Sequence, residues 1–337
     1  MNQPLISVLL SVYNGEKFVA EAVQSLLNQT YRNFELIIVD DGSSDRTAEI
    51  LNQFTDNRIK RLSNEKNFGL SQSLNRAGEI AQGKYLARMD ADDVSLPDRF
   101  AKQVAFLEAH DKVGVLGSAA AQINSQGRVI STLLMPTTHA LILWRFFFDL
   151  AIVHSTVMMR RDLFRLIGGY DVSFIHVEDN ELWSRLLSLT QFANLEDVFV
   201  KRRLHNDSIS SINSNQQRRL STMVRKFFFN NTIHCQASYE TLRWFVDPFF
   251  VLTERQKKEL IFIFIRLYRY LTTNFVLDRE AEQVVEEDFF RRVSLAFNSD
   301  RRAVRKFLFR QLRDILPLTV RHCMKTSKLG YFFAQRI

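Results

Sequence analysis

The strongest constraint on the fold is an alternation of short apolar runs with single amphipathic segments through residue 116. Apolar runs rich in β-branched residues predict buried strands, and apolar residues at helical spacing predict helices between them. The predicted strands are Ile6–Val12, Glu35–Val39, Arg58–Leu62, Lys84–Met89 and Val113–Leu116, and the predicted helices are Glu16–Gln29, Arg46–Phe54, Ser71–Ala81 and Pro97–His110. Strands separated by single helices predict an α/β fold with a doubly wound, mostly parallel sheet and helices on both faces.

The pattern changes after Leu116. Ala120–Ile123 and Arg128–Thr132 flank a Ser-Gln-Gly turn and predict a hairpin. Farther along, we expect helices and strands in turn over Thr138–Phe148, Ser155–Arg160, Glu178–Leu189 and Val198–Leu204. Only helical patterns remain after Ser214, so we expect a C-terminal all-helical appendage.

Charge changes at the same point of the chain. Residues 1–214 carry 22 Lys and Arg against 25 Asp and Glu, whereas residues 215–337 carry 23 against 12. The net charge of +8 therefore comes from the C-terminal part. This asymmetry predicts a boundary near Ser214, between an α/β domain of residues 1–214 and a basic, Phe-rich helical region of residues 215–337.

The sequence gives no indication of secretion or of a membrane span. Cys235 and Cys323 have no partner pattern for a disulfide framework or a zinc site. The N-terminus has no signal-type apolar stretch. No apolar run reaches the ~20 uninterrupted residues that a spanning helix needs. We therefore expect a cytoplasmic protein.

Acidic residues follow two of the predicted strands. Asp90-Ala91-Asp92-Asp93 ends one strand, and carboxylates at alternate positions can share Mg²⁺ or Mn²⁺, since such ions prefer oxygen ligands. Asp40-Asp41-Gly42 ends another, where a carboxylate can accept hydrogen bonds from a nucleoside. The alternatives are a solvated acidic turn at the first position and a helix cap formed by Asp41 at the second.

Several motifs together resemble those of the inverting family 2 glycosyltransferases of GT-A fold. The matching segments span roughly residues 4–212 and are Ile6–Gly15, Ser25–Thr30, Phe34–Ser44, Met89–Pro97, Gly168–Asp171, Glu178–Trp183 and Arg203–Ser210. The resemblance implies a nucleotide-sugar-binding catalytic domain in residues 1–214.

The resemblance also assigns roles to single residues. Ser11, Tyr13 and Asp41 match uridine-binding positions, with Asp40 as support, and Asp90 matches the ribose-side acid. Asp92 matches the direct metal ligand, and Asp93 is a supporting carboxylate beside it. His205 matches a position that approaches the metal and the diphosphate. Asp179 matches the catalytic base and is paired with Glu178. His154 either lines the acceptor side or ends a strand. Asp179, at a predicted helix start, is also typical of a residue that stabilises the helix dipole.

The resemblance implies a metal-dependent transfer of one sugar from a UDP-sugar, with Mn²⁺ or Mg²⁺, in O-antigen, capsule or exopolysaccharide synthesis. The acceptor is expected to be a saccharide, with undecaprenyl diphosphate as the candidate carrier. The Gln-x-x-Arg-Trp motif of processive members is absent after Asp179. Two alternatives stay open. The first is a nucleotidyltransferase, which is expected to carry a Gly-rich, basic N-terminal loop. The segment Ser11–Gly15 is neither Gly-rich nor basic. A degenerate binding or scaffold protein would lack acidic positions that are present here.

The C-terminal region mixes cations with bulky apolar residues, as in Arg225–Phe229, Arg291-Arg292 and Arg305–Arg310. Such a composition suits a helix that lies on an anionic membrane surface. We expect a peripheral location at the inner face of the cell membrane. The alternative is a helical bundle with a Phe core and solvated cations. No nucleic-acid-binding fold is recognised, so no nucleic-acid partner is expected.

Overall fold

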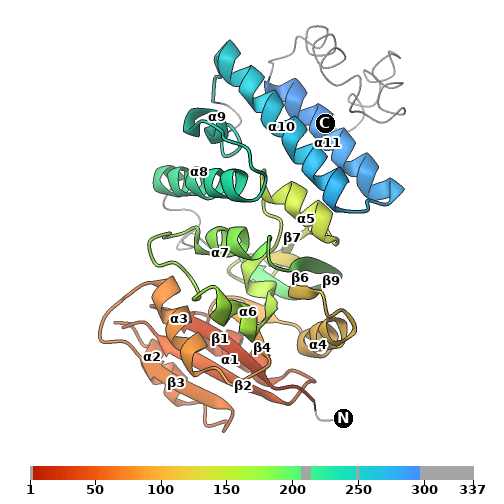
Figure 1. The fold of residues 1–337 in the computed structure, drawn as a ribbon. Helices are drawn as coiled ribbons and strands as arrows, with labels where there is room; N and C mark the ends of the chain where they lie inside the picture. The colour runs from red at the N-terminus through yellow and green to blue at the C-terminus, as the bar shows by residue number, and fades with distance from the viewer. Residues whose placement is uncertain (1–2, 206–213, 248–249, 297–337) are drawn as a thin grey trace. The chain divides into compact units, whose positions relative to one another are not determined.

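The computed structural model describes residues 3–205, 214–247 and 250–296 (Figure 1). The chain forms two compact units, of which the first is Met1–His234 and the second begins at Cys235. The unit boundary therefore lies beyond Ser214, where the charge balance changes, because the helix that begins at Ser214 packs within the first unit.

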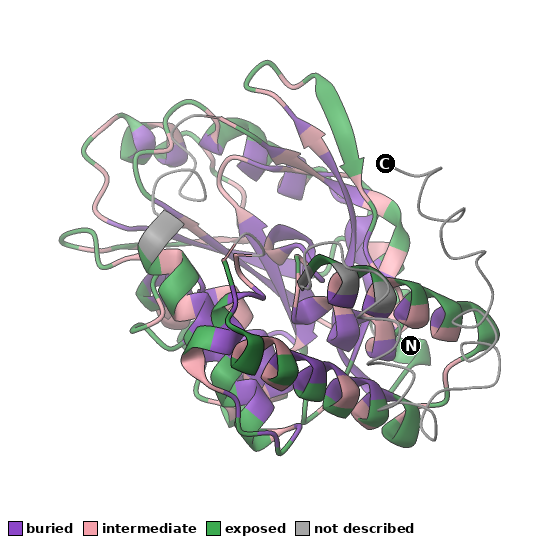
Figure 2. Cartoon of the chain, turned by 90° about the horizontal axis from the view of Figure 1, so that it is seen from above, coloured by how far each residue is buried: buried purple, intermediate pink, exposed green. Residues whose placement is uncertain are grey.

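Nine strands of the described residues form one sheet in the order β3-β2-β1-β4-β8-β6-β9-β5, with β7 paired to β6. The strands are β1 (Ile6–Val12), β2 (Phe34–Asp40), β3 (Ile59–Ser63), β4 (Tyr85–Asp90), β5 (Val94–Ser95), β6 (Val113–Ile123), β7 (Val129–Leu133), β8 (Met158–Arg160) and β9 (Gln191–Arg203). Figure 2 shows that the strands inside the sheet are mostly buried, whereas many of the helices present an exposed side.

The parallel half of the sheet brings three strand ends together. β1 lies between β2 and β4 and is parallel to both. In this register Ser11 is paired with Asp90 of β4, and Val12 with Asp40 of β2. The acids that follow β2 and β4 therefore lie at the same edge of the sheet, on either side of the end of β1. This edge is where an open α/β sheet binds ligands.

The second half of the sheet is mixed. β8 runs antiparallel to both β4 and β6, whereas β6 and β9 are parallel. The predicted hairpin is confirmed, since β7 pairs antiparallel with β6. The strand predicted over Ser155–Arg160 is shorter, because His154–Thr156 forms a 3₁₀ turn. In that turn the Thr156 hydroxyl donates to the Val153 carbonyl, which a strand conformation does not allow.

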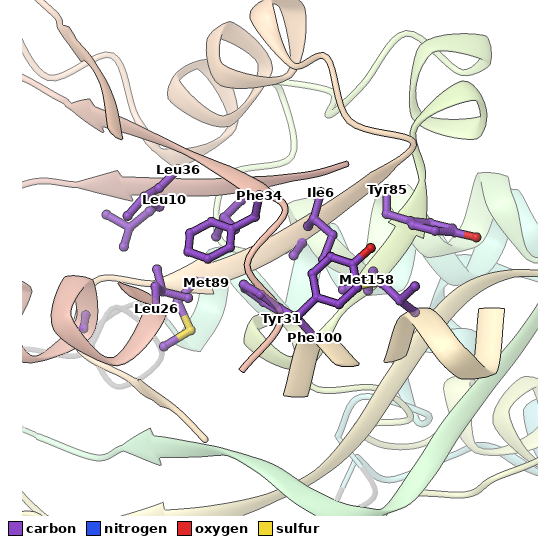
Figure 3. Packing of buried hydrophobic residues seen from close by; sticks show 14 of the residues in the cluster. Ile6, Leu10, Leu26, Tyr31, Phe34, Leu36, Tyr85, Met89, Phe100 and Met158 are labelled. Atoms are coloured by element: carbon purple, nitrogen blue, oxygen red, sulfur yellow. The ribbon is translucent and has the colours of Figure 1, made fainter. Parts of the chain in front are cut away.

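Helices cover both faces of the parallel half. Alternate residues of β1, including Ile6 and Leu10, pack in one cluster with α1 (Val19–Leu27), α2 (Thr47–Asn52) and α4 (Arg99–Ala109). Figure 3 shows Leu26 of α1 and Phe100 of α4 among these residues. The opposite face of β1 and β2 contacts α3 (Leu70–Ile80). The remaining helices of the first unit are α5 (His139–Phe146), α6 (Arg161–Leu166), α7 (Glu178–Leu186) and α8 (Ser214–Asn231).

Helix α8 belongs to the core of the first unit. Phe228 and Phe229 are fully buried and lie against Phe147 of the segment after α5, with ring centroids 5.1 and 4.5 Å away. Arg225 is buried as well, and its Nε donates to the carbonyl of Phe147. Phe228, Phe229 and Arg225, which the sequence pattern suggested for membrane binding, therefore pack inside the first unit. Of the three Phe residues in this run, Phe227 is half exposed.

The second unit contains α9 (Tyr239–Arg243), α10 (Glu254–Asn274) and α11 (Arg279–Ala296) among its described residues. Its core includes Phe264, whose ring contacts those of Trp244 and Phe289. Thr253 begins α10 with a capping box to Gln256. In the described parts of both units, every helix is too short or too polar to cross a membrane.

Candidate active site

The carboxylates at the end of β2 accept hydrogen bonds from the chain itself. Asp41 is 2% exposed. Its Oδ1 accepts from Asn64 Nδ2 at 2.6 Å and from the Phe68 amide at 3.0 Å, and its Oδ2 accepts from the Gly69 amide at 2.8 Å. Asp40 Oδ1 accepts from the Ser43 amide. Asp41 therefore fixes the segment that precedes α3, and the alternative that it caps α2 is wrong.

The segment Asn64–Gly69 is the part of this site that the sequence did not reveal. Arg76 of α3 donates to Asn64 Oδ1, and Asn64 Nδ2 donates to Asp41, so Asn64 links Asp41 to α3. Gly42 has φ +74°, and a Cβ at this position would lie 2.6 Å from the carbonyl carbon of Lys66. Only glycine fits such a close approach at a positive φ. These contacts join residues that lie far apart in the sequence, so a local sequence pattern does not predict them.

The end of β1 presents an open surface beside Asp41. Ser11 is half-buried, and Tyr13 is 49% exposed. The loop that follows is held by the loop after β2, since the Asn14 amide donates to Ser43 Oγ and the Ser44 amide to Asn14 Oδ1. Tyr13 is therefore half exposed at the edge of the sheet, next to a loop that Asn14 ties to the loop after β2.

The carboxylates at the end of β4 form a cluster of three acids that lie close together. One oxygen each of Asp90, Asp92 and Asp93 lies within 4.8 Å of the others. Asp93 is 1% exposed, and only one of its oxygens has a hydrogen bond within the described residues, from the Arg203 amide at 2.8 Å. Burial and the charge of Asp90 raise the pKa of Asp92, and burial and both neighbours raise the pKa of Asp93.

Such a donor set fits a divalent cation. It supplies only carboxylate oxygens, which Mg²⁺ and Mn²⁺ prefer, and it contains a buried oxygen with no hydrogen bond. Asp93 is buried, whereas Asp90 and Asp92 are half-buried. Repulsion among the three acids, which helps to raise the pKa of Asp92 and of Asp93, is what a bound cation would relieve.

Residues at and just after the end of β9 contact this cluster. His205 Nε2 lies 2.8 Å from Asp92 Oδ2, so the structure brings the predicted histidine to the predicted metal ligand. Arg203, which the sequence did not single out, donates its Nε to the Asp92 carbonyl and its Nη2 to Glu21 of α1. Its guanidinium also lies 4.5 Å from the ring of Phe18. Arg203 therefore fixes the acidic turn against the start of α1.

The acid pair at the start of α7 faces the same cluster. Burial and the charge of Asp179 raise the pKa of Glu178 to about 7. Burial raises the pKa of Asp179, and the charge of Asp90 adds to the effect at both residues. Asp179 Oδ1 accepts a hydrogen bond from the Asn180 amide at 2.6 Å. Carboxyl groups with raised proton affinity thus lie near enough to the end of β4 for the charge of Asp90 to act on them, although the two are distant in the sequence.

His154 is packed rather than open. Its Nε2 lies 2.7 Å from the hydroxyl of Tyr170, and its ring contacts Trp183 edge-on. Burial, together with the charge of Arg88, lowers the pKa of His154 well below its usual value, so the imidazole is neutral. Tyr170 is tied in turn to α3, because Asn75 bonds both its amide and its carbonyl. His154 therefore supports the loop before α7.

Comparison with known proteins gives this arrangement a family. A profile described as "Glycosyl transferase family 2" matches residues 7–168. The O-antigen biosynthesis glycosyltransferase WbnJ of Escherichia coli is 34% identical over 235 residues, which cover 68% of this chain and 91% of that protein. The UDP-Glc:alpha-D-GlcNAc-diphosphoundecaprenol beta-1,3-glucosyltransferase WfgD, also of E. coli, is 29% identical over 213 residues, which cover 61% and 81%.

Solved structures show the same fold. The crystal structure of Staphylococcus aureus TarS 1–349 in complex with UDP-GlcNAc has a TM-score of 0.56 at 19% identity and covers 98% of this chain and 92% of that one. The mannosyltransferase PcManGT of Pyrobaculum calidifontis, in complex with GDP-Man and Mn²⁺, has a TM-score of 0.52 at 14% identity and covers 100% and 89%. The acidic strand ends, the α/β sheet and these matches lead to one conclusion: the chain belongs to glycosyltransferase family 2.

Proposed function

We propose that this glycosyltransferase is metal-dependent and inverting, and that it moves one sugar from a UDP-sugar to a saccharide acceptor. The observation that carries the proposal is the cluster of Asp90, Asp92 and Asp93 at the strand end beside Asp41, with oxygens within 4.8 Å of one another. Nucleotide contacts, a cation site and a proton acceptor are what such a transfer requires, and each has candidate residues at this edge.

We assign the nucleotide and the metal to different residues of the site. Tyr13 and Asp41 would hold the base at the end of β1, with Ser11 and Asp40 beside them and Asp90 toward the ribose. Asp92, supported by Asp93 and approached by His205, would hold Mn²⁺ or Mg²⁺. A cation there supplies positive charge to the leaving diphosphate. PcManGT, which shares the fold, was crystallised with Mn²⁺, which supports this choice of metal.

Asp179 would act as the base. A carboxylate on the far side of the sugar can take the proton of the acceptor hydroxyl as that oxygen attacks, and one displacement inverts the anomeric carbon. Raised proton affinity suits this role, since a base works best with a pKa near the working pH. Burial raises the pKa of Asp179 in that direction, and Glu178 beside it is raised to about 7.

The donor and acceptor classes rest on relatives. TarS was crystallised with UDP-GlcNAc, and the printed activity of WfgD uses UDP-Glc and an acceptor linked to diphosphoundecaprenol. We propose a UDP-sugar as donor and a lipid-linked saccharide as acceptor, in the synthesis of an O-antigen or a similar surface polysaccharide, as in WbnJ.

A peripheral position on an anionic membrane would bring the enzyme to such an acceptor. Phe228 and Phe229 do not serve this purpose, because they are buried. The hypothesis depends on Arg305, Lys306 and Arg310, which lie outside the described residues. Replacement of these three by Glu is expected to release the protein from anionic vesicles in a sedimentation assay and to leave UDP-sugar hydrolysis unchanged. Equal partitioning of both proteins would contradict membrane binding by these residues.

One assay tests the proposed function directly. Purified protein is screened against several UDP-sugars and GDP-Man, with a lipid-linked saccharide acceptor, and release of the nucleoside diphosphate is measured with Mn²⁺ and with EDTA. We expect UDP release from one UDP-sugar that depends on both metal and acceptor. Undiminished turnover in EDTA would contradict the metal, and turnover of GDP-Man alone would contradict the uridine nucleotide.

A further inference from the structure

Arg88 is a buried cation in the middle of the acidic site, and the sequence motifs gave it no role. It lies on β4 two residues before Asp90, so both side chains project from the same face of the strand. The guanidinium is 3% exposed, and its Nη1 lies 2.5 Å from Asp90 Oδ1. Burial of a cation is costly unless it is paired, so this placement calls for an explanation.

Two other arginines of the first unit, the buried Arg99 and the half-buried Arg160, are used differently. Arg99 donates to the carbonyls of Arg88 and Val157, and Arg160 donates to the carbonyls of Val113 and Leu107. Those arginines join backbone segments. Arg88 instead has a carboxylate as its partner. Buried Arg203 also pairs with a carboxylate, that of Glu21, but it donates to backbone carbonyls as well, whereas the buried Nε of Arg88 makes no hydrogen bond within the described residues. Its arrangement is therefore that of a counter-ion and not of a backbone clamp.

The field of Arg88 reaches the acids on both sides of the site. Burial raises the pKa of Glu178 and of Asp179, and the charge of Arg88 opposes that rise at both. The same charge helps to keep His154 neutral, after burial. The charge of Arg88 thus acts on Asp90, with which it is paired, and on the acid pair of α7.

We propose that Arg88 is a positioning residue of the transfer site: it anchors Asp90 and offsets part of the charge of the carboxylates while no cation is bound. This inference rests on the proposed metal site. Arg88 and the divalent cation would then compete in part for the same negative charge. Loss of Arg88 should make the site bind Mn²⁺ more tightly, because the carboxylates lose a counter-charge. It should also slow transfer, because Asp90 is no longer held in one place.

These opposite effects distinguish positioning from a structural role. The test compares wild type, Arg88→Met, Arg88→Lys and the control Arg160→Met, which removes an arginine that binds carbonyls away from the acids. Calorimetric titration with MnCl₂ gives the metal affinity, thermal unfolding in EDTA and in Mn²⁺ gives stability, and kcat and KM are taken with the best UDP-sugar.

For Arg88→Met we expect a Mn²⁺ dissociation constant lower by about threefold or more and a kcat lower by about tenfold or more. Arg88→Met should unfold at a lower temperature than wild type in EDTA, and this difference should be smaller in Mn²⁺. Arg88→Lys should recover part of kcat. Arg160→Met should lose stability equally with and without Mn²⁺. Equal or weaker Mn²⁺ binding by Arg88→Met, beside a wild type that binds Mn²⁺, overturns this inference alone. A wild type that does not bind Mn²⁺ overturns the metal site and this inference with it.

Discussion

The two acidic strand ends look alike in the sequence, yet they differ in what neutralises them. At the end of β2, Asp41 accepts hydrogen bonds from a side-chain amide and two backbone amides. At the end of β4, Asp93 has one oxygen without a hydrogen bond among the described residues, and burial with neighbouring acids raises the pKa of both Asp92 and Asp93. At one end amide groups hold a single buried carboxylate, whereas at the other three carboxylates lie close together with Arg88 paired to Asp90.

This difference separates two uses of the same residue type. Amide donors fix a carboxylate in place and leave it as a precise acceptor for a neutral group such as a base. Carboxylates that repel one another gain from a cation and are poor partners for a neutral ligand. Substitutions at the two strand ends should therefore have different effects on metal binding and on nucleotide binding.

Asp92→Ala should reduce transfer by about a thousandfold or more, because the diphosphate charge that develops in the transition state loses its stabilising cation. The fold should survive, since the substitution removes one of three acids that repel each other. UDP release and circular dichroism measure the two effects. Asp162→Ala, which removes an acid with a 91% exposed side chain, is the control and should match wild type. Wild-type turnover by Asp92→Ala would place the metal elsewhere.

Asp179→Asn should lower turnover by about a hundredfold or more, because an amide cannot accept the proton of the acceptor hydroxyl. UDP affinity and Mn²⁺ affinity should remain close to those of wild type. Single-turnover kinetics and calorimetry with UDP separate the two quantities. If the variant keeps its rate, Glu178 becomes the candidate base.

Asp41→Ala should destabilise the protein by about 3 kcal/mol, because the Phe68 and Gly69 amides and Asn64 lose a charged acceptor. It should also weaken UDP binding, and the Mn²⁺ affinity in the absence of UDP should not change. Denaturant unfolding and titrations with each ligand measure these effects. A variant with normal stability that binds Mn²⁺ less well would erase the distinction between the strand ends.

Glu178→Gln should change how stability depends on pH. The pKa of Glu178 is raised from 4.5 to about 7 in the folded state, so the folded protein binds its proton more tightly than the unfolded chain does. Its contribution to stability is complete below pH 4.5 and is lost as the pH rises through about 7. Relative to the variant, wild type should therefore lose about 2 kcal/mol of unfolding free energy between pH 5 and pH 7.5. Parallel pH profiles for the two proteins would contradict the raised pKa.

The sequence predicts the strands and helices around the parallel half well, because their apolar periodicity is local. It also predicts the acids at the ends of β2 and β4, since each directly follows a buried run. Arg203 and Asn64 were not predicted as partners, because the bonds of Arg203 to Asp92 and of Asn64 to Asp41 join positions far apart in the sequence. The antiparallel insertion of β8 between β4 and β6 depends on long-range pairing in the same way.

The most direct test of the difference between the strand ends is the shift in unfolding temperature that Mn²⁺ produces. A ligand that binds the folded state raises the unfolding temperature with its concentration. Wild type, Asp92→Asn and Asp41→Asn are melted in EDTA and in a series of Mn²⁺ concentrations without nucleotide. We expect wild type and Asp41→Asn to rise by equal amounts, and Asp92→Asn, which keeps its shape and loses its charge, not to respond. Equal shifts in all three proteins, or a response lost in Asp41→Asn and kept in Asp92→Asn, would contradict the account.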